Sequence, residues 1–145
     1  MNHSGIARAR EEIDAATLLL DNGFTTQALS RAFHGAYHAA ETALLVLGET
    51  RGDFSDVVSA FVRRVVRERA LDPESGRLLR SLFNQSLLAD HGYEPVPATE
   101  AGAAIAAATT VVVEVEKWLA DPGRSAARRG DATPMPAKPP RRRSR

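Results

Sequence analysis

The stretch Ser30-Arg-Ala-Phe-His-Gly-Ala-Tyr-His-Ala-Ala40, continued by Glu-Thr-Ala-Leu-Leu45, decides the fold of this chain. Its apolar residues recur at steps of three and four, which is the period of one face of an α-helix. That face consists of Leu29, Phe33, Ala36, Tyr37, Ala40, Leu44 and Leu47. We therefore predict a long amphipathic helix over about residues 24–47, ended by Gly48.

The same period marks the segments before and after this helix, and no strand-like alternation interrupts them. Asn22-Gly23 ends a first helix, Asp72-Pro73 begins a fourth one, and the two prolines in 91–97 predict a loop. The predicted helices cover about residues 5–21, 54–69, 73–90 and 99–119, the last capped by Thr99, and Thr17, Phe54 and Leu87 are expected to face the core. Short connections favour antiparallel neighbours, so we predict an all-α, up-and-down antiparallel bundle of about five helices.

Composition excludes several classes of protein. The 145 residues contain no cysteine, which removes disulfides, thiolate metal sites and a cysteine nucleophile. The longest weakly polar run, 101–113, is shorter than the roughly 20 residues that span a bilayer, and no signal peptide precedes the first helix. We expect a soluble cytoplasmic protein without a membrane segment.

Charge separates a body from a tail. Residues 1–119 contain 11 basic and 16 acidic side chains, whereas 120–145 contain eight basic and two acidic ones together with five of the eight prolines. The tail contains no Leu, Ile, Val or aromatic residue, so we predict that 1–119 folds and that 120–145 is disordered. Such a tail either tethers the protein to a polyanion or acts as a solubilising extension.

The segment from Ser30 to Ala40 resembles the signature of HEPN-domain proteins, small prokaryotic helical proteins that often pair with a minimal nucleotidyltransferase. The resemblance extends over roughly residues 5–119 and includes the end of the fourth helix at Ala89-Asp90. It implies a homodimer in a toxin–antitoxin or defence system. It also implies a metal-independent ribonuclease without a cofactor, whose active motif is an Arg followed after four to six residues by a His.

The chain departs from that motif. His91 is present beside Asp90, but positions 84, 85 and 86 are Asn, Gln and Ser, and the resemblance aligns Ser86 with the arginine. Histidine has an ordinary pKa near neutrality and suits proton transfer at a ribose hydroxyl, so His91 is a candidate catalytic residue oriented by Asp90. Alternatively, His91 caps the helix end. Tyr93 either stacks on a base or packs over the end of the bundle.

Arg31, His34, His38 and Glu41 share one face of the second helix, because they are separated by three, four and three residues. This stripe either lines a cleft for RNA or phosphate, or holds zinc, or is an ordinary interface or satisfied helix surface. The arginines at 63, 64, 67, 69, 77 and 80 are either an RNA-backbone track or solvated charges near neutralising glutamates.

Two functions therefore remain open, beside a purely structural dimer that binds no ligand. In the first, the dimer cleaves RNA with His91, Asp90 and an arginine from elsewhere, for which Arg31 is a candidate. In the second, a degenerate dimer binds a nucleotidyltransferase, RNA or a nucleotide through the stripe of the second helix and the basic tail.

Overall fold

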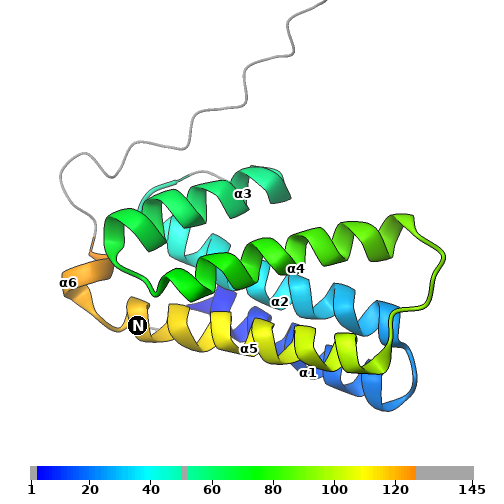
Figure 1. Cartoon of the computed structure of the whole chain (residues 1–145). Helices are drawn as coiled ribbons and strands as arrows, with labels where there is room; N and C mark the ends of the chain where they lie inside the picture. The colour runs from blue at the N-terminus through cyan, green and yellow to red at the C-terminus, as the bar shows by residue number, and fades with distance from the viewer. Residues whose placement is uncertain (1–2, 50–51, 127–145) are drawn as a thin grey trace, which may run out of the picture.

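The computed structural model describes residues 3–49 and 52–126, and within these ranges the chain is helical without any β-strand, which confirms the all-α prediction (Figure 1). The elements are α1 (Ser4–Asp21), α2 (Thr25–Val46), α3 (Phe54–Ala60), the π-helical segment η1 (Phe61–Arg67), α4 (Pro73–His91), α5 (Ala98–Leu119) and α6 (Pro122–Ser125). The long helices pack lengthwise as a bundle.

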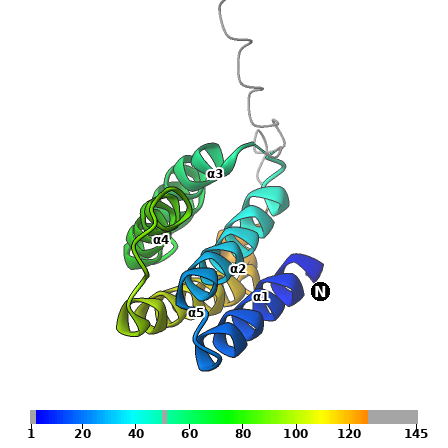
Figure 2. The same ribbon diagram turned by 90° about the vertical axis from the view of Figure 1, so that its right-hand side faces the viewer.

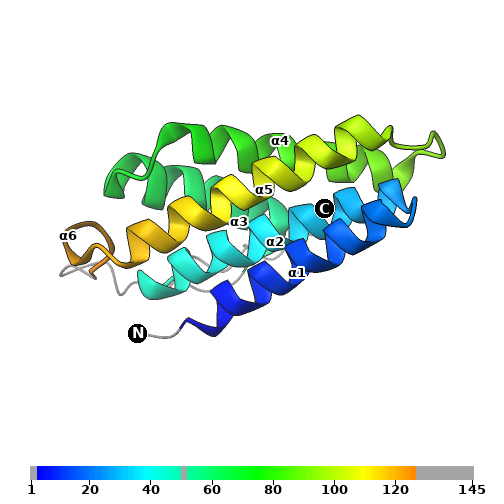
Figure 3. The same cartoon turned by 90° about the horizontal axis from the view of Figure 1, so that it is seen from below.

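Helix α2 occupies the centre of the bundle and contacts α1, α3, η1, α4 and α5 (Figure 2). Its inner faces are rich in alanine, and Gly35 on α2 has no Cβ where α1 passes, so the backbones of these two helices approach closely. Seen from below, α1, α2 and α5 lie alongside one another (Figure 3). The largest fully buried side chains are Trp118, Phe33 and Phe61.

The direction of α3 and η1 differs from the expected antiparallel order. Phe54, which begins α3, lies against the ring of Tyr37 in the middle of α2, with 4.8 Å between ring centroids. Arg64 of η1 forms an ion pair with Glu49, beyond the end of α2. The segment from α3 through η1 therefore advances toward the same end of the bundle as α2 and runs parallel to it. Helices α1 and α4 run antiparallel to α2 (Figure 1).

Most helix ends follow local signals. Gly23 and Gly48 adopt positive φ angles of 84° and 81°, and the Asp72 side chain accepts a hydrogen bond from the backbone N–H of Glu74 ahead of Pro73. The Thr99 cap is wrong, because α5 begins at Ala98 with Pro97 before it.

Three side chains expected in the core are exposed instead. Thr17 lies on the outside of α1, and Phe54 and Leu87 are 40% and 41% exposed. Conversely, Glu12 is buried on α1 and Trp118 on α5, where its indole N–H donates to the carbonyl of Arg69 at 2.9 Å. The third predicted helix is also not uniform, since its second half is π-helical.

The folded body extends beyond the predicted boundary at residue 119. Helix α6 follows α5, Ser125 is buried, and the Arg69 guanidinium donates to the carbonyl oxygens of Arg124 and Ala126 at 3.1 and 2.6 Å. The rest of the predicted disordered tail, 127–145, lies outside the described residues.

Helix α5 is the one described helix that is long and apolar enough, by length and composition, to cross a membrane. Here it packs against α1, α2 and α4 and buries Ala104, Val111 and Trp118. Of its most apolar stretch, 33% is buried within the bundle.

Candidate functional site

His91 is the last residue of α4, and Gly92 leaves the helix in an extended conformation. Both His91 and Asp90 are exposed, and neither side chain makes a hydrogen bond or ion pair with another residue of the described ranges. The imidazole therefore does not cap the helix carbonyls within this chain, so the capping interpretation is not what the structure shows. The His91 ring is open to solvent or to a second molecule.

Helical phase separates His91 from the residues expected to assist it. Successive residues of an α-helix point about 100° apart, so Asp90 and His91 do not face each other on one chain. Ser86, which the resemblance aligns with the motif arginine, is only 4% exposed and lies about 140° around α4 from His91. Of the three positions at the motif spacing, only Asn84 shares the exposed face of His91, two turns earlier.

Large apolar side chains are exposed around His91. Leu88 is 76% exposed and Leu87 41% exposed, and Tyr93, two residues after His91, is fully exposed. The interpretation that Tyr93 packs over the end of the bundle is therefore wrong for the single chain. Stacking of Tyr93 on a base stays a prediction.

The stripe on α2 is engaged inside the bundle. The Arg31 guanidinium donates to the Glu12 carboxylate of α1 at 2.9 Å, and Arg8 lies 3.9 Å from the same carboxylate. Arg31 thus points toward α1, and its charge is already compensated. Sequence reasoning missed Glu12, although it stands among Ala9, Ile13 and Ala16 on the inward side of α1.

His34 is fixed by its own helix. Its Nδ1 lies 2.7 Å from the Ser30 carbonyl oxygen, which can only accept, so Nδ1 carries the hydrogen and donates it. The ring also meets the edges of Phe33 and Phe54, each at 5.6 Å between centroids. Phe54 at the start of α3 thereby covers part of the stripe.

His38 is half-buried one turn further along α2. Burial lowers the pKa of His38 below its ordinary value of 6.5, and nearby Arg8 and His34 add to this effect, against the opposing attraction of the Glu12 and Glu41 carboxylates. Its neighbour Tyr37 donates to Glu41 at 2.9 Å. A histidine that favours its neutral form is a poor phosphate ligand, so the geometry favours a satisfied helix surface over an anion-binding cleft.

The structure does not bring the stripe on α2 close to His91 of α4. Phe33 of α2 contacts Phe83 of α4 at 5.7 Å between ring centroids, and this fixes the register of the two helices. His34 lies beside Phe33, whereas His91 lies eight residues past Phe83, about 12 Å further along α4. No group of three His, Asp or Glu side chains suited to a metal ion occurs in the described part of the chain.

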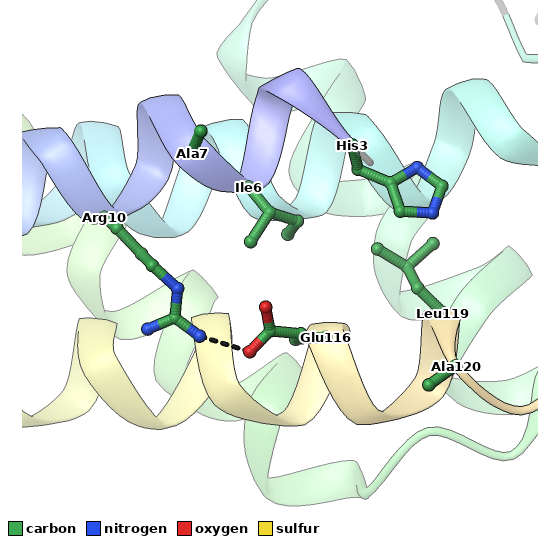
Figure 4. Close-up of a pocket in the computed structure, with 7 residues that line it drawn as sticks. All are labelled: His3, Ile6, Ala7, Arg10, Glu116, Leu119 and Ala120. Carbon is green, nitrogen blue, oxygen red and sulfur yellow. Dashed lines mark hydrogen bonds and ion pairs between the residues drawn. The ribbon is translucent and has the colours of Figure 1, made fainter. Parts of the chain in front are cut away.

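A separate small cleft opens between the ends of α1 and α5, with a volume of about 360 Å³ (Figure 4). Its walls are mostly apolar, and an ion pair between Arg10 and Glu116 closes one side. Sequence analysis did not anticipate this cleft. Its titratable lining residues are His3, Arg10 and Glu116, and the Glu116 carboxylate is already paired to Arg10.

Comparison with known proteins gives weak but consistent matches. No family model matches the chain. It is 31% identical over 85 residues to a protein of Thermotoga maritima named UPF0332 protein, covering 59% of this chain and 64% of that protein, which is less than two thirds of its length. It is 26% identical over 111 residues to a Methanocaldococcus jannaschii protein named "Putative toxin", covering 77% and 83% of the two chains. The chain is thus similar, at low identity, to small toxin-like proteins.

Proposed function

We propose that this chain is a HEPN-type toxin of a toxin–antitoxin system and acts in the cytoplasm as a metal-independent endoribonuclease. The observation that carries the proposal is the exposed His91 at the end of α4, which has no partner among the described residues. The similarity to a protein named as a toxin supports the same class of function.

In the proposed reaction, neutral His91 accepts the proton of a ribose 2′-hydroxyl, and the 2′-oxygen attacks the adjacent phosphorus. The bond to the 5′-oxygen of the next nucleotide breaks, that oxygen takes a proton from water as it leaves, and protonated His91 gives its proton back to the resulting hydroxide. The products are a 2′,3′-cyclic phosphate and a free 5′-hydroxyl. Tyr93, two residues away, is placed to stack on a flanking base.

A single copy of the chain leaves this site incomplete, because negative charge grows on the phosphoryl oxygens and requires a cation. Arg31 is committed to Glu12, and Ser86 is buried on another side of α4. We therefore propose a homodimer, in which a second copy covers the exposed Leu87 and Leu88 and supplies an arginine to His91.

The test uses the purified full chain with total RNA in excess chelator. The parent is expected to cleave and leave 2′,3′-cyclic phosphate ends, detected by mass spectrometry, whereas His91→Ala leaves the RNA intact. His3→Ala is the matched histidine control and is expected to retain activity, because His3 precedes α1, and the start of α1 and the end of α4 lie at opposite ends of the bundle (Figure 1). Equal cleavage by the parent and His91→Ala would refute the assignment.

One observation favours a second function, a binding module that has lost catalysis. None of the three motif positions before His91 carries a cation, and the aligned position 86 is buried. In this case a nucleotidyltransferase partner docks on the end of α4, and RNA stays intact with every variant. Co-purification with that partner, lost in a Leu87→Glu/Leu88→Glu variant that still folds, would distinguish this function from the first.

A further inference from the structure

The arginines around the junction of η1 and α4 differ in burial and in their ion pairs. Arg64 pairs with Glu49 and lies 3.3 Å from Glu68, and Arg69 is buried against the carbonyl oxygens of α6. These two are therefore structural. Arg67 and Arg80 are exposed, and within the described ranges neither forms an ion pair.

The exposed arginines border a groove of about 500 Å³ between η1 and the first half of α4. Its floor is apolar, and all of its charged lining residues are cations; the lining consists of Val62, Val66, Arg67, Pro73, Gly76, Arg77 and Arg80. Gly76 is part of this floor, where a Cβ would make ordinary van der Waals contact with Val62 and Val66 at 3.4 Å. Arg77 pairs with Glu74, which does not line the groove.

The groove and His91 lie on one continuous exposed face of α4. The residues of that face are all exposed and recur every three or four positions, with Leu87 and Leu88 adjacent: Arg77, Arg80, Asn84, Leu87, Leu88 and His91. Arg80 stands eleven residues before His91, about 16 Å along the helix axis. The groove therefore opens on the same side of α4 as His91, with Leu87 and Leu88 between them.

We propose that this groove, the arginine groove, binds the phosphate backbone of single-stranded RNA on one side of the bond that His91 cleaves. Guanidinium groups bind phosphate oxygens through paired N–H donors. When an unpaired arginine neutralises a phosphate, the RNA releases counterions. The apolar floor accepts a ribose or base face next to the bound phosphates. The choice of RNA as the occupant rests on the proposed function, whereas the anionic character of the ligand follows from the charge of the lining.

The π-helical segment strengthens the inference. π-Helical turns are rare in proteins, and those that occur within α-helices are often found at functional sites. Here η1 contributes Arg67 and the two valines of the floor. The chain also leaves the described body at Ala126, which is bound to Arg69 just after η1.

The experiment measures binding of a short fluorescein-labelled oligouridylate by anisotropy, with His91→Ala as the uncleaving background. Arg67→Gln/Arg80→Gln is compared with Arg8→Gln/Lys117→Gln, which removes the same charge from α1 and α5. Each phosphate contact contributes a factor of about 5 at 0.1 M salt for single strands, so loss of two contacts weakens binding about 25-fold. The slope of log affinity against log salt becomes shallower by about 1.4.

The control double variant is expected to bind within about twofold of its background, since its charges lie away from the groove. Equal weakening in both double variants would overturn the arginine groove, as would absence of binding by the background protein. Displacement of the probe by poly-L-glutamate as readily as by unlabelled oligouridylate would assign the groove to an acidic polypeptide and also overturn it. Cleavage by the parent tests His91 separately, so either proposal can fail while the other stands.

Discussion

Replacement of Gly35 by alanine tests the close approach of α1 and α2 that positions the Glu12–Arg31 pair. A Cβ at position 35 would lie 2.9 Å from Cγ1 of Ile13 and 3.0 Å from the backbone carbonyl oxygen of Ala9. The isoleucine side chain can rotate, but the carbonyl moves only if α1 moves. Overpacking of this kind costs about 1–3 kcal/mol, and the gain in helix propensity from Gly to Ala is about 1 kcal/mol.

Gly35→Ala is therefore expected to lower the free energy of unfolding by about 1 kcal/mol, despite the better helix former. Gly102→Ala on α5 is the matched control, because the nearest atom to its added Cβ, on Leu20, is 3.9 Å away. That variant gains about 0.5–1 kcal/mol from propensity alone. Urea unfolding followed by circular dichroism measures both, and the two midpoints should differ by about 1 M at an m-value near 2 kcal/mol/M. If Gly35→Ala proves as stable as Gly102→Ala, the packing argument is refuted.

Three further outcomes are expected. His38 has a lowered pKa in the folded protein, so folding is favoured above about pH 6.5 and loses this contribution as the pH falls below that value. His38→Gln should therefore show a smaller decline in unfolding free energy between about pH 7.5 and 5.5 than the parent. Trp118→Phe removes the hydrogen bond to the buried Arg69 carbonyl and should cost about 1–2 kcal/mol in urea unfolding, and an unchanged midpoint would show that the bond is dispensable. Asn84→Arg places a cation on the face of His91 and should raise RNA cleavage at least about tenfold, whereas Ser86→Arg buries a charge and should unfold the protein; equal activity of the two variants would contradict the assigned faces.

The helices were predictable because their signals are local. Each signal acts within a few residues of the chain: the apolar period of α2, the glycines that end α1 and α2, and the Asp72-Pro73 start of α4. The parallel course of α3 was not predictable, because contacts far apart in the sequence, such as Phe54 with Tyr37, determine it. The π-helical geometry of η1 was not predictable either, because the composition of its sequence does not differ from that of an α-helix.

Burial of single side chains was harder to predict than the helices themselves. Leu87 fits an inward pattern by hydrophobicity, yet it lies on the same exposed face as Arg80 and His91. Glu12 fits an outward pattern by charge, yet it is buried because Arg31 on the neighbouring helix compensates it. Such pairs depend on which helices meet, and a period of 3.6 residues does not contain that information.

The candidate site illustrates how spacing and phase differ on a helix. A motif written as an arginine followed after four to six residues by a histidine allows three positions, 84, 85 and 86, and these point in three directions about 100° apart. The structure makes position 84 equivalent to His91 in direction and makes Ser86 part of the buried surface. Absence of an arginine at 86 is therefore weaker evidence against catalysis than it is in the sequence alone. The site lacks a cation on the exposed face of α4 near His91, and this is the group that the proposed second copy of the chain has to supply.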